Sequence, residues 1–120
     1  MTRYQNQIDH RFAALADPTR RAMVERLSRG ATPVSDLAAP FNMALPTVMQ
    51  HLKVLEASGV IRSSKTGRVR TCELDPAALR GIESWLAAQV LQWESRLDRL
   101  DELALRLAQQ EELTEEKTDD

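Results

Sequence analysis

Hydrophobic residues recur every three or four positions along most of the chain, which is the spacing of amphipathic helices. This spacing predicts a first helix over about 8–16, a second that ends at Gly30, a short third around 34–38, and a fourth from 45 to Gly59. Asp17-Pro18 and Thr32-Pro33 both have the sequence of an N-cap followed by the first helical residue. Glycine is the residue that most often ends a helix in the left-handed conformation.

The pattern becomes extended after the fourth helix. Residues 60–64 and 69–74 flank a glycine-containing turn at 65–68, so they predict one β-hairpin. Asp75-Pro76 then caps a last helix from about Ala77 to Gln110, whose apolar positions again step by three or four. That helix is roughly 50 Å long and exceeds the width of so small a domain. Its apolar stripe therefore needs a partner, for which a second copy of the chain is the simplest choice.

The predicted fold class is mainly α with one β-hairpin. We expect one domain over residues 1–110 and an acidic, flexible tail over residues 111–120. The chain contains neither a run of about 18 apolar residues that would span a membrane nor the apolar core of a signal peptide at its start. Cys72 is the only cysteine, which excludes an internal disulfide and favours a cytoplasmic location. By default it is an inert, half-buried thiol, and a redox role for it stays open.

The net charge of −2 hides an asymmetry along the chain. Residues 1–76 carry +4 and residues 77–120 carry −6. A basic front half can meet a polyanion, while an acidic rear half would be held away from one. No catalytic constellation accompanies these charges, because the serines lack a histidine base at a recognisable motif and no glycine-rich phosphate loop occurs. We therefore expect a binding protein and not an enzyme.

The order of the elements predicts a winged helix-turn-helix with a long C-terminal dimerisation helix. The fourth helix has one buried stripe and a polar outer face, and an α-helix fits the major groove of B-DNA. The short third helix braces it, and the basic hairpin beside it can reach phosphates or the minor groove. The candidate DNA-binding residues are Leu45, Pro46, Thr47, Met49, Gln50, His51, Lys53, Lys65, Arg68 and Arg70.

Several of these candidates have a structural alternative. His51 lies at the edge of the buried stripe, so a DNA contact and a packing role fit its position equally well. Met49 could touch a thymine methyl group or pack against Leu45 in the core. Leu45 and Pro46 open the helix, which fits a structural role as well as a contact. Arg70 could stiffen the hairpin instead of binding phosphate.

Three motifs occur in order along the chain. The first is Leu15–Arg20, with the pattern Leu-x-Asp-Pro-Thr-Arg. The second is a His-Leu-x-x-Leu helix motif before a Gly-hydrophobic pair, formed by His51, Leu52, Leu55, Gly59 and Val60. The third is Gly67-Arg68 in the predicted hairpin turn. Together these motifs resemble those of the ArsR family of winged-helix repressors, in which the Gly-Arg pair belongs to the wing. The resemblance covers about residues 8–100. It implies a homodimeric DNA-binding regulator, usually an autorepressor that a small effector releases from DNA.

The chain departs from the metal-sensing members of that family. Where those members carry a Cys-x-Cys cluster, this chain has residues 33–36, Pro-Val-Ser-Asp, without a thiol. Others bind zinc through histidines of the C-terminal helix, whereas this chain has no histidine beyond His51. We expect no metal and no cofactor, as in a non-metal-sensing branch. For His10 we expect an exposed or interfacial position.

The expected function is a homodimeric, sequence-specific transcriptional regulator, most simply a repressor that binds an inverted-repeat operator in double-stranded DNA. Its effector, where one exists, is an unidentified small molecule. The expected dimer interface comprises Ile8, Phe12, Leu86, Val90, Trp93, Leu97 and Leu100. The alternative is a winged-helix protein-interaction module with weak or lost DNA binding. A pure protein-binding domain, however, has no need of a basic hairpin beside a polar helix face.

Overall fold

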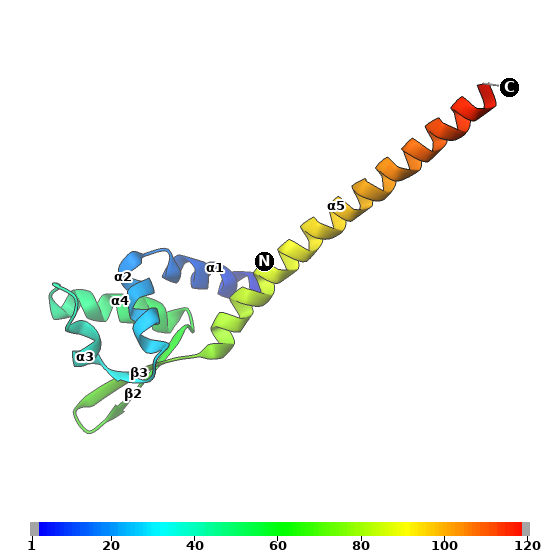
Figure 1. Cartoon of the computed structure of the whole chain (residues 1–120). Helices are drawn as coiled ribbons and strands as arrows, with labels where there is room; N and C mark the ends of the chain where they lie inside the picture. The colour runs from blue at the N-terminus through cyan, green and yellow to red at the C-terminus, as the bar shows by residue number, and fades with distance from the viewer. Residues whose placement is uncertain (1–2, 119–120) are drawn as a thin grey trace. The chain divides into compact units, whose positions relative to one another are not determined.

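The computed structural model describes the backbone of residues 3–118 and the side chains of residues 6–115. Along the chain its elements are α1 (Arg3–Leu15), α2 (Pro18–Leu27), β1 (Thr32–Pro33), α3 (Val34–Ala38), α4 (Leu45–Ala57), β2 (Ile61–Thr66), β3 (Val69–Leu74) and α5 (Pro76–Thr118) (Figure 1). The chain divides into two compact units between Glu83 and Ser84, so α5 contributes to both. This architecture confirms the mainly α fold class with one β-hairpin.

The first unit folds around one hydrophobic core. The helices α1 to α4 and the base of the hairpin contribute to it, together with the start of α5. Its buried members are Ala14, Met23, Leu27, Leu37, Val48, Leu52, Leu55, Val60, Ile61, Cys72 and Ala78. Burying a large apolar side chain contributes roughly 1.5–3 kcal/mol, so this cluster is the main term that holds α4 in place. Phe41, in the turn from α3 to α4, is partly buried and packs against the same core.

Thr32 does not cap a helix, contrary to the sequence-based expectation. Thr32 and Pro33 form the short strand β1, which pairs antiparallel with Cys72 and Thr71 of β3 and gives the sheet order β1-β3-β2. The Thr32 hydroxyl donates to the Gly30 carbonyl at 3.0 Å, and Pro33 occupies the N-cap of α3 without a side-chain cap bond. A strand of two residues is too short for hydrophobic alternation to reveal it.

The helix starts predicted at Asp17-Pro18 and Asp75-Pro76 are confirmed by their cap bonds. The Asp17 carboxylate accepts a hydrogen bond from the backbone N–H of Arg20 at 3.0 Å, and Pro18 opens α2. The Asp75 carboxylate accepts one from the backbone N–H of Ala77 at 3.0 Å, at the start of α5. Each carboxylate satisfies a donor that the first helical turn would otherwise leave unpaired.

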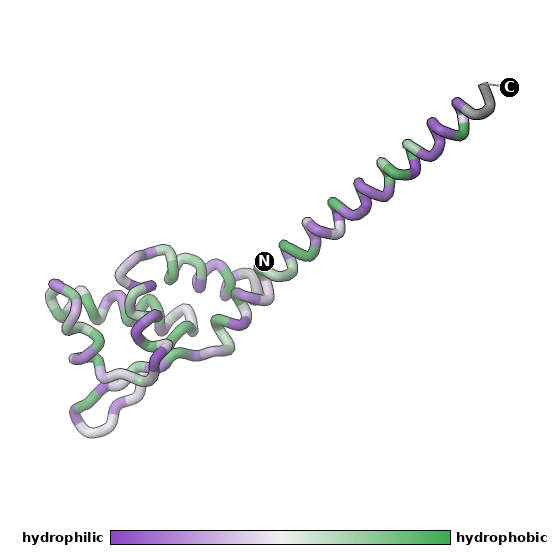
Figure 2. The backbone as a smooth tube through the Cα atoms, viewed as in Figure 1, coloured by the Kyte–Doolittle hydropathy of each residue, from purple (hydrophilic) through white to green (hydrophobic). Residues whose placement is uncertain are grey.

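Both terminal helices are longer than the sequence pattern indicated. The first helix begins at Arg3, not near Ile8, and α5 continues beyond Gln110 to Thr118. The added residues 3–7 and 111–118 are mostly polar, although Leu113 is apolar. Figure 2 shows the far part of α5 as mainly hydrophilic, with short hydrophobic stretches. Hydrophobic periodicity cannot detect such turns, because they have no apolar stripe. The helix end expected at Gln110 was therefore wrong.

Two glycines determine where α4 ends and where the hairpin turns. Gly59 has φ +81°, and it ends α4 with N–H bonds from Gly59 to the Glu56 carbonyl and from Val60 to the Leu55 carbonyl. This is the Schellman pattern of a helix C-terminus. Gly67, with φ +62°, is the first residue of a two-residue loop between β2 and β3. A glycine at that position is typical of a type II′ turn, whose twist matches the flanking strands.

We expect Gly59→Ala to lower the free energy of unfolding by about 1–2 kcal/mol, because an L side chain is strained in the left-handed region. A Cβ built at Gly59 meets no atom within 4 Å, so the cost is one of backbone conformation and not of crowding. Gly59→Asn is the control, because asparagine tolerates this conformation better. Urea denaturation measures both variants, and equal losses for alanine and asparagine would contradict the explanation.

Candidate nucleic-acid interface

The helix α4 turns an apolar stripe into the core and a polar stripe outward. Its buried residues are Val48, Leu52 and Leu55. Thr47, Gln50 and Lys53 are all exposed, and because they are three residues apart they form one continuous stripe. We call these three residues the polar face of α4. A threonine, a glutamine and a lysine together supply the donors and acceptors that base edges and phosphates require.

The apolar candidates at the start of α4 lie outside the core. Leu45 is 59% exposed and Met49 is 36% exposed, and Pro46 is also exposed. Met49 and Pro46 line a pocket between α4 and the hairpin. Of the alternatives for Met49, packing in the core with Leu45 therefore does not fit this structure.

The hairpin β2–β3 carries the basic candidates on its exposed part. Lys65, Arg68 and Arg70 are all exposed. Lys65 and Arg70 lie directly opposite each other in the strand register, so two positive charges share one face of the hairpin. Like charges in directly opposed positions destabilise a sheet. An anionic partner would relieve that repulsion, which suits a surface that meets phosphate.

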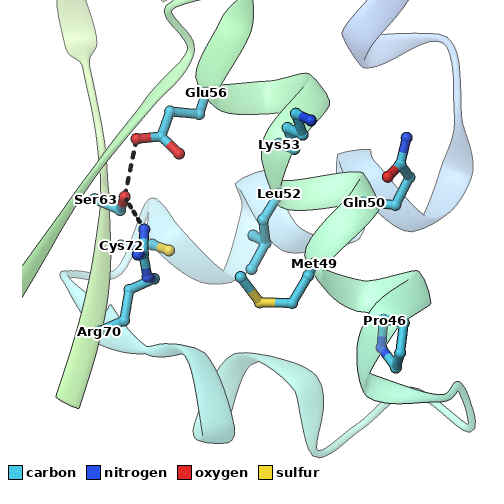
Figure 3. A pocket seen from close by; sticks show the side chains of 9 residues that line it. All are labelled: Pro46, Met49, Gln50, Leu52, Lys53, Glu56, Ser63, Arg70 and Cys72. Atoms are coloured by element: carbon cyan, nitrogen blue, oxygen red, sulfur yellow. Dashed lines mark hydrogen bonds between the residues drawn. The ribbon is translucent and has the colours of Figure 1, made fainter. Parts of the chain in front are cut away.

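One pocket of about 260 Å³ brings several candidates from both elements together (Figure 3). Its lining comprises Pro46, Met49, Gln50, Leu52, Lys53, Glu56, Ser63, Arg70 and Cys72. Across it, the Ser63 hydroxyl donates to Glu56 Oε1 at 2.9 Å and accepts from Arg70 Nη1 at 3.2 Å. Five candidate residues lie outside this lining. Lys65 and Arg68 lie towards the tip of the hairpin, and the others are Leu45, Thr47 and His51 of α4.

His51 lies apart from that pocket, at a junction of three helices. Its Nδ1 atom is 3.3 Å from Arg20 Nη1 and 3.9 Å from Asp17 Oδ2. The same Arg20 donates from Nε to the Ala14 carbonyl at 2.7 Å and from Nη2 to the Ala13 carbonyl at 3.2 Å. The guanidinium thus joins the last turn of α1 to α4. The sequence left open two roles for His51, a DNA contact and a packing role. The contact with Arg20 favours the packing role.

Asp17 is the anionic member of this junction. The pKa of its carboxyl group is lowered, chiefly by the hydrogen bond from the Arg20 backbone N–H and further by the nearby charge of Arg20. A carboxylate that accepts such bonds is stabilised in its charged form. Because the folded pKa is depressed, this contribution to stability is present above the unfolded pKa and is lost as pH falls through the folded value.

Sequence reasoning did not single out three residues that organise this surface. Arg20 was visible only as part of a motif, and Glu56 and Ser63 were not singled out. Arg20 and His51 are 31 positions apart, and Ser63 is seven positions from each of its partners. No local spacing rule connects such pairs, although the two motifs that contain Arg20 and His51 were recognised separately.

Cys72 forms part of the pocket wall and of the core. Its side chain is 1% exposed, and burial raises the pKa of the thiol, so the thiol stays protonated. A buried neutral thiol is a poor nucleophile. Across the described part of the chain, no three histidine, cysteine or acidic side chains gather as a metal site. Nor is any helix in residues 3–118 long and apolar enough to cross a membrane.

The expected interface residues divide into two groups. Ile8 is 5% exposed and Phe12 is half-buried, so Ile8 already packs within its own chain. The members on α5 are largely exposed in the single chain, namely Leu86, Val90, Trp93, Leu97 and Leu100. Large apolar side chains exposed in a row are a common sign of a protein–protein contact.

Comparison with known proteins agrees with a helix-turn-helix arrangement of the first unit. A family model described as a helix-turn-helix domain matches residues 15–64. The HTH-type transcriptional regulator Rv2034 of Mycobacterium tuberculosis is 41% identical over 76 residues, which are 63% of this chain and 71% of that protein. The transcriptional repressor SdpR of Bacillus subtilis is 31% identical over 75 residues, 62% of this chain and 83% of that one.

A solved structure extends the match. The crystal structure of the ArsR family transcriptional regulator RHA00566 is 54% identical, covers 79% of this chain and 98% of that one, and superposes with a TM-score of 0.74. The chain belongs to the ArsR family. The resemblance seen in the motifs is therefore confirmed, as is the winged helix-turn-helix. This ArsR-family member is a DNA-binding transcriptional regulator and not an enzyme.

We expect Arg20→Lys to lower the free energy of unfolding by about 1–3 kcal/mol, because a single ammonium cannot reproduce the guanidinium fork that reaches α1 and His51. Arg21→Lys is the matched control. Arg21 is exposed and its Nη1 donates to the Leu15 carbonyl at 2.9 Å, so its replacement should cost less than about 0.5 kcal/mol. Chemical denaturation compares the two, and similar losses would argue against a special role for Arg20.

Proposed function

We propose that this regulator is a homodimeric repressor that binds an inverted-repeat operator. One observation carries the proposal, which is the polar face of α4 exposed beside a basic hairpin. The repressor named among its relatives supports negative regulation. The charge asymmetry supports contact with DNA through the first 76 residues, because these are basic and the remainder of the chain is acidic.

Within each half-site, the two elements have different tasks. Thr47 and Gln50 read base edges in the major groove, where a glutamine can pair bidentately with adenine. Lys53 meets a phosphate or a guanine. Lys65 and Arg68 contact phosphates, which fixes the position of the protein without reading sequence. In a two-fold dimer the two copies of α4 lie in successive major grooves about 34 Å apart, which requires an inverted repeat.

A second copy of the chain covers the exposed stripe of α5. The spacing of Leu86, Val90, Trp93, Leu97 and Leu100 alternates between four and three residues, which keeps the stripe on one side of the helix. We do not assign Ile8 to this interface, because its side chain lies inside its own chain. Effector recognition, where it occurs, requires a small molecule and no metal ion.

We expect Arg68→Ala and Gln50→Ala to impair DNA binding in different ways. Arg68→Ala weakens binding to operator and scrambled DNA alike, and it makes the slope of log affinity against log salt shallower by about one unit. Gln50→Ala relaxes preference at one base pair per half-site, by about 1–3 kcal/mol. Gel-shift titrations at several salt concentrations measure both effects.

The control for the wing is Arg62→Ala. Arg62 is an exposed arginine of β2, paired with Glu73 at 3.5 Å on the face opposite to Lys65 and Arg70, so its loss should leave the salt slope unchanged. If Arg68→Ala also leaves affinity and slope unchanged, the hairpin is not a DNA-contacting wing. The alternative function, a winged-helix protein-interaction module, would then be favoured.

We expect wild-type protein to sediment as a dimer at micromolar concentration and Leu97→Glu to sediment as a monomer. A charge placed in the stripe must be desolvated on association. Leu105→Glu is the control, because Leu105 is an equally apolar, 64% exposed residue of α5 outside the stripe. A monomeric wild type, or equal dissociation by both variants, would refute the assignment.

A further inference from the structure

We propose that Glu56, Ser63 and Arg70 form a latch that orients the wing relative to α4, with Ser63 as the central positioning residue. The inference deepens the proposed DNA binding and rests on it. Glu56 belongs to α4, Ser63 to β2 and Arg70 to β3. The Ser63–Glu56 hydrogen bond of 2.9 Å joins β2 to α4, and the Arg70–Ser63 hydrogen bond of 3.2 Å joins β3 to β2 (Figure 3).

The latch lies where the hairpin leaves the core. Ser63 pairs with Cys72 in the strand register, and that rung is the outermost one with a buried member. Beyond it, residues 64–70 are all exposed. A two-stranded ribbon without packing is only marginally ordered by itself. The Ser63 rung, together with the adjacent Thr71 that pairs with Pro33 of β1, is therefore the last region in which the rest of the unit can set the direction of the wing.

Charge gives the latch a second role. Arg70 lies directly opposite Lys65, and their like charges repel. Through the Ser63 hydroxyl, the Glu56 carboxylate draws the Arg70 guanidinium towards α4 and away from the tip. Lys65 and Arg68 are left as the cations of the exposed tip. In this arrangement Arg70 positions the wing and does not itself bind phosphate. Of the two roles that the sequence allowed for Arg70, stiffening the hairpin is the one that this arrangement favours.

Such a latch contributes little to the stability of the fold, but it determines the orientation of the wing relative to α4. Glu56 and Arg70 are exposed, and a solvent-exposed polar contact contributes little to the free energy of unfolding. Variants should therefore fold. Specific binding needs α4 in the groove and the wing on its phosphates at the same time. A wing that moves freely must first be ordered, which weakens binding to the operator.

The test compares Ser63→Ala with Ser64→Ala, its matched control. Ser64 is the neighbouring exposed serine, and it pairs with Thr71 on the opposite face of the strand. We expect Ser63→Ala to weaken operator binding about fivefold with an unchanged salt slope, because the tip cations remain. Ser63→Thr, which keeps the hydroxyl, should restore wild-type affinity. Ser64→Ala should have no effect.

A measurement without DNA separates this inference from the proposed function. In the free protein, amide hydrogen exchange over residues 64–70 should become faster in Ser63→Ala and stay unchanged in Ser64→Ala and Ser63→Thr. Failure of the wild type to bind any DNA would reject the proposed function, while the exchange result would still judge the latch. Unchanged exchange and affinity in Ser63→Ala, or equal effects in Ser64→Ala, would overturn it.

Discussion

The arrangement of the first unit depends on one guanidinium, that of Arg20. It hydrogen-bonds the last-turn carbonyls of α1 at Ala13 and Ala14, and it reaches His51 in the middle of α4. Its own backbone N–H donates to Asp17, which caps α2. One residue therefore fixes how α1, α2 and α4 meet. The apolar core supplies most of the stability, but apolar contacts are not directional, and these hydrogen bonds select one packing among several of similar burial.

The opposite charges of the two ends of the chain follow from what each end contacts. The part that contains α4 and the hairpin has an excess of basic residues, and Glu56, the acidic residue of α4, accepts a hydrogen bond from Ser63 of the wing. The acidic excess occurs in α5, whose apolar stripe suits a protein contact. Acidic residues there would repel DNA and so leave α4 and the wing as the favoured surface for it.

The sequence predicted the elements whose signals are local and missed what depends on contacts between distant residues. The caps at Asp17 and Asp75 and the glycine that ends α4 act within a few positions, so they could be read directly. The strand β1 exists only because Thr32 meets Cys72, and Thr32 had the local sequence of a cap. For the candidate interface, the polar face of α4 followed from helical periodicity. Its supports, Arg20, Glu56 and Ser63, did not, because their partners lie in other elements.

The two polar links of α4 also explain why one particular face of it points outward. Successive residues of a helix are rotated by about 100°, so His51 and Glu56 fall on opposite borders of the stripe formed by Val48, Leu52 and Leu55. His51 is held by Arg20 on one side, and Glu56 is held by Ser63 on the other. A rotation of α4 about its axis would break one link or the other, although the core alone could tolerate a small one. Thr47, Gln50 and Lys53 lie opposite the buried stripe. The same two links therefore determine which side chains α4 turns outward.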